Sequence, residues 1–226
     1  MMKKRKKTII AAIVGSSILI GGIWLINEER CPNAPAFDDR FTRKFLNKDK
    51  KVDHGFYEFE SKTGQYTMWF PEEYQLLHEN EQQYVKEGKL YERYRAVSNS
   101  NELEYMTVEF SNKIKKNESI YVERLFQEQF NSNKPYKIET RNVSIYYDKA
   151  YTYFKGTHKQ VNRKKEGYVP NEYVAYIADK HSNSVIKFYF DNVKAELNER
   201  QGREQDKRIM KILKSVQFDD FKDTRN

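Results

Sequence analysis

The sequence predicts an α+β domain, with an antiparallel sheet covered by two helices, preceded by one N-terminal transmembrane helix. Three observations support this prediction. An uncharged apolar run fills residues 8–26, short aromatic and β-branched runs separated by turn residues follow from His54, and two segments with helical spacing interrupt them. The expected divisions are a cytoplasmic basic tail (1–7), a transmembrane helix (8–26), an extracytoplasmic tether (27–53) and an extracytoplasmic α+β domain (54–226).

The apolar run is long enough to cross a bilayer. Thr8 to Ile26 contains 19 residues without a charge, which as a helix extend about 28 Å at about 1.5 Å per residue. Five cations precede the run and Glu28 and Glu29 follow it. This asymmetry predicts a single-pass signal anchor in a cell membrane, with the N-terminus cytoplasmic, the rest outside and residues 8–26 in contact with the lipid bilayer. The richness in Lys, Asn, Ile, Tyr and Phe favours a bacterial membrane.

Two other kinds of export signal fit the N-terminus less well. A cleaved signal peptide has an apolar run of about 7–15 residues and a small-x-small site soon after it. Here the run is longer, and Ala34-Pro35-Ala36 comes only after a charged stretch. A bacterial lipid anchor needs small and apolar residues directly before the modified cysteine. Because Glu28-Glu29-Arg30 precedes Cys31, the only cysteine, lipidation there is not predicted.

The net charge of +8 belongs mostly to the N-terminal tail. Lys3-Lys4-Arg5-Lys6-Lys7 supplies five of the 41 basic side chains, and the 36 that remain are nearly balanced by 33 acidic ones. A nearly neutral segment of this length lacks the electrostatic footprint of a DNA-binding domain. Nucleic acid is therefore excluded as a partner.

The tether contains prolines and many charges. Within it Phe37, Phe41 and Phe45 recur at roughly helical spacing. This pattern predicts a short amphipathic helix, whose apolar face would lie on the domain or on the membrane.

Strand patterns begin at Gly55. Residues 55–60 and 66–70 flank a loop with Gly64, and residues 89–97 and 104–110 flank a second polar loop, so two hairpins are expected. Met106, Val108 and Phe110 alternate with polar residues, as in a strand with one buried face. Further strands are predicted at about 136–141, 143–147, 150–157, 173–178 and 185–191, with a long exposed hairpin loop at 159–171.

Two segments have the 3.6-residue period of amphipathic helices. Ser119 is expected to cap the first, and the second is expected from about Glu204. The apolar stripes comprise Val122, Leu125, Phe126 and Phe130 in the first helix, and Ile209, Ile212, Leu213 and Val216 in the second. One sheet with two helices over a face is an α+β domain of ordinary size.

The order of these elements resembles that of PsbP-like domains, named for an extrinsic subunit of photosystem II. Tyr66-Thr-Met-Trp-Phe-Pro71-Glu-Glu-Tyr-Gln75 is similar to the opening of such domains, and Ile209-Met-Lys-Ile-Leu-Lys-Ser-Val-Gln-Phe218 is similar to their closing helix. The resemblance covers about residues 55–218. It implies a PsbP-like α/β sandwich used mainly to bind other proteins, without a family-wide enzyme chemistry, and it transfers no functional residue.

No pattern for catalysis, a cofactor or a metal is found. The chain has no nucleophile elbow, phosphate loop or dinucleotide fingerprint. Its four histidines, His54, His78, His158 and His181, lack zinc-ligand spacing. Acidic pairs such as Glu72-Glu73 and Asp219-Asp220 could serve glycoside hydrolysis, although a chain with 33 acidic residues contains such pairs by chance. We therefore expect a protein that is not an enzyme.

Tyrosine is the residue type that most indicates a binding surface. The chain has 17 tyrosines and 14 phenylalanines, and tyrosine suits a surface that is half apolar and half wet. The alternative interpretation is a sheet that uses aromatic residues as strand formers beside an ordinary solvated loop. The predicted binding surface comprises Tyr146, Tyr147, Tyr151 and Tyr153 in strands and the basic loop residues Arg163, Lys164 and Lys165.

The leading hypothesis is a non-catalytic single-pass membrane protein that displays an interaction domain outside the cell, as an accessory subunit or adaptor of an envelope complex. Confinement near the membrane would raise the effective concentration of a weak binding surface. Two alternatives are an extracytoplasmic hydrolase of envelope material and a sensor of anionic wall polymer, which the basic loop would contact.

Overall fold

The computed structural model describes residues 31–98, 104–113, 117–132, 134–162, 168–192 and 197–219. The chain divides into two compact units, residues 1–33 and 34–226. The predicted tail (1–7), the predicted transmembrane helix (8–26) and the basic loop residues Arg163 to Lys165 lie outside the described residues. Among the helices that are described, none combines the length and the hydropathy needed to cross a membrane.

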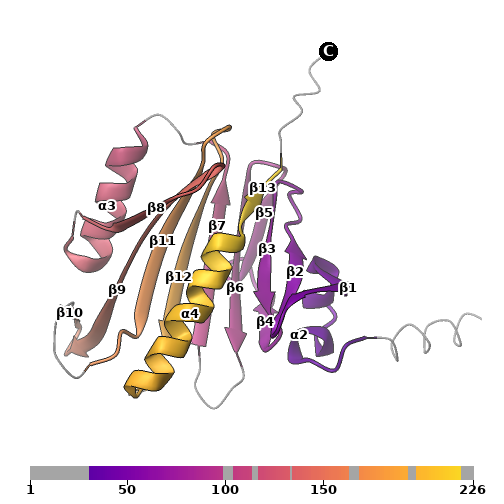
Figure 1. Ribbon diagram of the computed structural model, residues 1–226, viewed down its shortest axis with the longest axis horizontal. Helices are drawn as coiled ribbons and strands as arrows, with labels where there is room; N and C mark the ends of the chain where they lie inside the picture. Colours follow the sequence, from indigo (N-terminus) through magenta and orange to yellow (C-terminus); the bar gives the residue numbers. More distant parts are fainter. Residues whose placement is uncertain are drawn as a thin grey trace, which may run out of the picture. The chain divides into compact units, whose positions relative to one another are not determined.

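The larger of two antiparallel sheets contains most of the strands (Figure 1). Its strand order is β10-β9-β11-β12-β7-β6-β4, with β5 also paired to β6 and β8 to β9. The strands are β4 (Tyr74–Leu77), β5 (Tyr84–Glu87), β6 (Tyr91–Ser98), β7 (Glu104–Ser111), β8 (Tyr136–Glu139), β9 (Val143–Lys155), β10 (His158–Asn162), β11 (Glu172–Asp179) and β12 (Val185–Asn192). The alternation at Met106, Val108 and Phe110 reflects one buried face of β7.

The smaller sheet has the order β1-β2-β3-β13. It consists of β1 (Leu46–Asp53), β2 (Phe56–Glu60), β3 (Tyr66–Pro71) and the short β13 (Gln217–Phe218). Gly64, in the loop between β2 and β3, has a φ of 64°, a conformation that glycine adopts without steric cost. Phe218 pairs with Tyr66, so the C-terminal strand closes this sheet next to the first predicted hairpin.

The two longer helices cover opposite faces of the larger sheet. α3 (Glu118–Phe130) packs Val122, Leu125, Phe126 and Phe130 in a cluster with Ala150, Val174 and Tyr176 of β9 and β11. α4 (Glu199–Ser215) instead bonds to Lys149 of β9 and Tyr173 of β11. These residues alternate with Ala150 and Val174 along the same two strands, so their side chains point to the opposite face of the sheet. Figure 1 shows α4 crossing the sheet diagonally and α3 at its outer end.

Aromatic rings fill the space between the two sheets. The centroid of Phe59 lies 5.1 Å from that of Tyr94 and 5.6 Å from that of Phe70, and Tyr66 lies 5.3 Å from Phe110. All five side chains are fully buried. Rings at these separations stabilise a core beyond their buried area. The aromatic richness of the sequence is therefore explained in large part by this core.

The predicted fold class is wrong. The described residues are mostly antiparallel strands, in two sheets rather than one, and few helices accompany them. The expected α+β sandwich behind a spanning helix is therefore corrected to a mostly β architecture. The physical reason is that alternation specifies strands and buried faces but does not specify which strands pair. Strands of both sheets bury one face against the same core, so they carry the same pattern.

Residues 35–53, expected in the tether, belong to the folded unit, which begins at Ala34. They form α2 (Pro35–Asp38), the 3-10 helix η1 (Thr42–Phe45) and β1. Phe37 and Phe45 are buried, and the ring of Phe45 stacks on Phe59 at 5.3 Å. The Leu76 amide donates to Thr42 Oγ1 at 2.9 Å. The sequence analysis missed β1 because this strand lies at an exposed edge of the smaller sheet, where its side chains are mostly charged.

Candidate binding surface

Strand β9 separates the predicted tyrosines into two groups. Successive side chains of a strand point to opposite faces, so Tyr147, Tyr151 and Tyr153 share one face and Tyr146 lies on the other. Tyr146 packs against the α3 cluster, and its ring centroid lies 6.3 Å from that of Tyr176. Tyr146 therefore contributes to the core beneath α3 and is not part of a shared surface with the other three.

Two further tyrosines join the group on the α4 side. Tyr136 of β8 stacks on Tyr147 at 5.4 Å, because the register places these residues opposite each other. Tyr168 lies 4.5 Å from Tyr151, which lies 6.0 Å from Tyr153. We call these five residues the tyrosine surface. Tyr136, Tyr153 and Tyr168 remain 59%, 46% and 41% exposed.

The sequence analysis missed Tyr136 and Tyr168. The position of Tyr136 could have been predicted from the short spacing between the strands expected at 136–141 and 143–147. Such a spacing predicts a hairpin, and the register of that hairpin places Tyr136 opposite Tyr147. Nothing in the local pattern indicated Tyr168, which precedes β11 in an irregular segment. Arg163, Lys164 and Lys165, the predicted basic part of the surface, lie outside the described residues.

The charge next to the tyrosine surface is paired. Lys149, between Tyr147 and Tyr151 on the same face, contacts Asp206 of α4 at 2.5 Å. The Tyr173 hydroxyl donates to the other oxygen of Asp206 at 2.5 Å. Burial, together with the bond to Asp206, raises the pKa of Tyr173, so its hydroxyl stays protonated. The result is an aromatic surface beside paired charges, and aromatic residues are enriched at protein interfaces.

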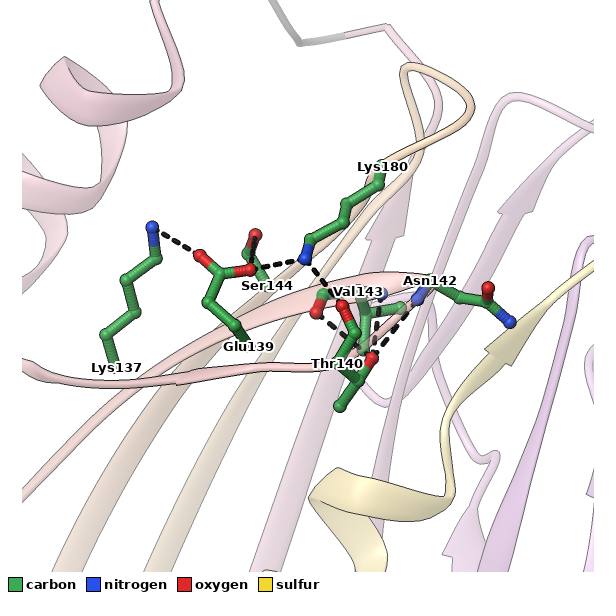
Figure 2. Close-up of polar contacts among 7 residues, drawn as sticks. All are labelled: Lys137, Glu139, Thr140, Asn142, Val143, Ser144 and Lys180. Carbon is green, nitrogen blue, oxygen red and sulfur yellow. Dashed lines mark hydrogen bonds and ion pairs between the residues drawn. The ribbon is translucent and has the colours of Figure 1, made fainter.

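A polar network fixes the end of the β8–β9 hairpin at which Tyr136 and Tyr147 pair (Figure 2). Lys137 and Lys180 each contact a carboxylate oxygen of Glu139 at 2.5 Å, and Ser144 donates to the same group at 3.0 Å. The bond to Lys137, followed by that to Lys180, lowers the pKa of Glu139 to about 2. A depressed folded pKa gives a contribution to stability that is present above the unfolded value of about 4.3. It is lost as the pH falls through about 2.

A turn closes this hairpin at Thr140. Its hydroxyl oxygen accepts from the Val143 amide at 3.0 Å and its carbonyl accepts from Lys180 Nζ at 2.5 Å. Figure 2 shows Lys180 reaching across from the β11–β12 turn to both Thr140 and Glu139. The hairpin is thereby held against the neighbouring strands, which keeps Tyr136 opposite Tyr147.

A second polar cluster lies between α4 and the edge of the larger sheet. Arg208 donates to Glu73 Oε1 at 2.7 Å and to Glu104 Oε2, and the Tyr74 hydroxyl donates to Glu104 Oε2 at 2.8 Å. Glu72, the neighbour of Glu73, instead pairs with Lys51 at 2.9 Å. The acidic pair considered for hydrolysis is therefore divided between two separate ion pairs.

No metal centre is found within the described ranges, where no group of three or more His, Cys, Asp or Glu side chains could hold an ion. His78 illustrates the scattered histidines. It stacks on Phe41 at 4.5 Å and lies 3.5 Å from Asp39. These contacts connect the segment that contains Asp39 and Phe41 to the residue after β4.

Residues 32–217 match the model of a family described as "Putative lipoprotein YvcA". The chain belongs to this family. The family has the Mog1/PsbP-like fold, so the resemblance to PsbP-like domains is confirmed at the level of the family. No curated protein matches the chain. No solved structure matches it.

Family membership identifies an extracytoplasmic, membrane-associated bacterial protein. It also corrects the predicted signal anchor. A lipoprotein is held at the membrane by lipid attached to a cysteine, so the transmembrane, single-pass description conflicts with the family. The match begins directly after Cys31. The residues before Cys31 are charged and depart from a lipobox.

Proposed function

We propose that the protein is a non-catalytic interaction module outside the cell, serving as an accessory subunit or adaptor of an envelope complex. The tyrosine surface would bind the protein partner. The observation that carries the proposal is the presence of two groups of tyrosine rings on the same face of β9. Tyr136 stacks on Tyr147, and Tyr151 contacts Tyr153 and Tyr168.

The physical chemistry of tyrosine supports a binding role. Each aromatic ring can bury about 150–250 Å² at an interface. Because tyrosine has few rotatable bonds, little conformational entropy is lost when it binds. Here Tyr136 stacks on Tyr147, and the Glu139 network holds their hairpin. A surface that is already arranged before binding avoids part of the cost of association.

The setting at the membrane supports an adaptor over a freely diffusing binder. A protein confined to the same surface as its partner meets it at a high effective concentration, so a modest interface is sufficient.

The polar groups described near the tyrosine surface, Lys149, Asp206 and Tyr173, are bonded to one another. This pairing supports a positioning role for them rather than a chemical one.

Replacing Tyr136 and Tyr153 together by alanine should release the protein from its complex without unfolding it. Central aromatic residues of interfaces contribute about 2 kcal/mol or more each to binding, whereas exposed substitutions change stability by only about 0.5 kcal/mol. Native electrophoresis of gently solubilised membranes should show wild type in a high-mass species and the variant at lower mass. Circular dichroism should show the same thermal transition for both.

Ile120→Ala on α3 is the matched control, because Ile120 and Tyr136 are both 59% exposed. It should migrate as wild type does. Retention of the double tyrosine variant in the high-mass species would refute the proposed surface, as would equal release by the Ile120 variant.

A further inference from the structure

The side of the larger sheet that carries α3 is only partly covered by that helix. The α3 cluster includes Ala150 of β9 and Val174 and Tyr176 of β11, and Figure 1 shows α3 beside β8 and away from β6 and β7. The register continues the same side of the sheet across β12 and β7 to β6. Six half-buried residues of these three strands form what we call the open face: Arg93, Arg95, Thr107, Glu109, Lys187 and Tyr189.

Two arginines of β6 lie next to each other on the open face. Arg93 and Arg95 are two residues apart, which places their Cα atoms about 6.6 Å apart. Arg93 donates to the Gln82 carbonyl at 2.9 Å, and the guanidinium of Arg95 lies 4.1 Å from the ring centroid of Tyr105. Within the described ranges these contacts include no carboxylate. Among the nitrogens of Arg95 only Nε is both buried and unbonded, so its two Nη atoms can donate to a ligand.

The nearest carboxylates of the open face and of α3 have cations of their own. Glu109 accepts from the Tyr91 hydroxyl at 3.1 Å through Oε1, and its Oε2 lies 3.6 Å from Lys187 Nζ. Glu128 of α3 pairs with Arg124 at 2.7 Å. Lys187 and Arg124 therefore offset these two negative charges.

Asp191 is the carboxylate that competes for Arg95. It lies in β12 opposite Tyr105, the ring on which Arg95 stacks. Burial, followed by the charge of Glu172, raises the pKa of Asp191. The charges of Lys159 and Arg95 act in the opposite direction without cancelling the rise. Asp191 therefore opposes an incoming anion less than an ordinary aspartate would.

Hydroxyl groups lie beside the arginines. Thr107 is opposite Arg95 in the register, and Tyr189 is opposite Thr107. Burial raises the pKa of Tyr189, so its hydroxyl stays protonated and can donate. The oxygens of a phosphate point in several directions, so one phosphate can accept from two guanidinium groups and a hydroxyl. A carboxylate has two coplanar oxygens, which a single arginine fork can engage.

We propose that the open face binds a phosphate ester carried by a narrow, water-soluble molecule. The position of α3 favours such a ligand over lipid head groups. The helix stands on the same side of the sheet and is about 10 Å thick, so a flat bilayer that touches α3 is held away from Arg93 and Arg95. The inference does not depend on the tyrosine surface, because Tyr147, Tyr151 and Tyr153 point to the opposite side of β9.

The test uses the full chain, uniformly labelled with ¹⁵N in a neutral detergent, and glycerol 3-phosphate as the probe. Backbone amide signals of β6 and β7 should shift with saturation, and glycerol should not shift them. Arg95→Gln should weaken binding at least about tenfold, because it removes charge-assisted hydrogen bonds. Arg95→Lys, which keeps the charge and loses the fork, should bind with intermediate affinity. Asp191→Asn should bind several-fold more tightly than wild type, because it removes the competing carboxylate.

Arg200→Gln is the matched control, because Arg200 is 83% exposed on α4, which covers the other side of the sheet. It should bind as wild type does, and thermal melting checks that each variant is folded. The proposal is overturned if glycerol 3-phosphate causes no saturable shift, if Arg95→Gln binds as tightly as wild type, or if Asp191→Asn binds more weakly. Tighter binding of tetraglutamate would instead assign an acidic peptide. Different β6 and β7 signals in nanodiscs with and without phosphatidylglycerol would assign lipid, and either result would also overturn the proposal.

Discussion

Replacing Arg208 by alanine should lower the free energy of unfolding by about 2–4 kcal/mol. Removal of one partner of a fully buried ion pair costs about 3–5 kcal/mol, and here the loss is smaller because Arg208 and Glu73 keep 28% and 32% of their side-chain exposure. The substitution leaves the carboxylates of Glu73 and Glu104 without their guanidinium. It also removes one of the polar contacts that hold α4 against the sheet edge. Chemical denaturation at neutral pH measures the loss.

The loss should depend on pH in a defined direction. Burial raises the pKa of Glu73 in the folded protein, while the charge of Arg208 opposes this rise. Without Arg208 the folded pKa rises further above the unfolded value, so the folded state of the variant takes up its proton more readily. The stability that the Arg208→Ala variant loses should therefore be largest above the folded pKa of Glu73, and it should shrink as the pH falls through that pKa.

Arg203→Ala is the control on the same helix. Arg203 pairs with Glu199 at 3.4 Å, with side chains 65% and 85% exposed. Such exposed pairs contribute less than about 1 kcal/mol. Equal, small losses from the two arginine variants, or a deficit at Arg208 that grows towards acid, would contradict the role given to the Arg208 cluster.

A chain that begins at His54 should fail to fold, whereas one that begins at Ala34 should fold cooperatively. The shorter chain lacks α2, η1 and β1, and with them the buried rings of Phe37 and Phe45. Removal of a single buried phenylalanine side chain costs about 3–5 kcal/mol. The loss of two, together with the edge strand, is comparable to the about 5–15 kcal/mol that stabilises a whole domain. Circular dichroism and thermal melting of the two chains measure the difference.

A single substitution checks the cause. Phe45→Ala in the longer chain should lower stability by about 3–5 kcal/mol, because the Phe45 ring stacks on Phe59 in the core between the sheets. A cooperative melting transition of the chain from His54 at the temperature of the longer chain would show that residues 34–53 do not belong to the folding unit.

The sequence predicts strands well where alternation is strong and neighbours are close. Residues 89–97 and 104–110 correspond to β6 and β7, joined by a short connection. Pairings between distant segments leave no such local signal. The pairing of Phe218 with Tyr66, which closes the smaller sheet, is one example. The helix α4 begins at Glu199, before the expected Glu204, because Asn198 and Gln201 form a capping box that the sequence analysis overlooked.

The candidate surface was predicted only in part, because contacts between separate segments leave no local signal in the sequence. Tyr147, Tyr151 and Tyr153 share one face of β9. Tyr146 was grouped with them only by adjacency, although the period of two assigns it to the opposite face. Tyr136 required the β8–β9 register, and Tyr168 required the path of the chain before β11. A binding surface composed from several segments is a tertiary property, so single runs of tyrosine indicate only part of it.

Site-specific photo-crosslinking in intact cells tests the central claim, that the tyrosine surface contacts a partner, most directly. Benzoylphenylalanine placed at Tyr153 is compared with the same group at Leu90, since these positions are 46% and 44% exposed. Tyr153 lies in β9, whereas Leu90 lies in the turn between β5 and β6. We expect a discrete crosslinked species of higher mass from position 153 and none from position 90. No product at position 153, or the same product in equal yield at position 90, would contradict the account.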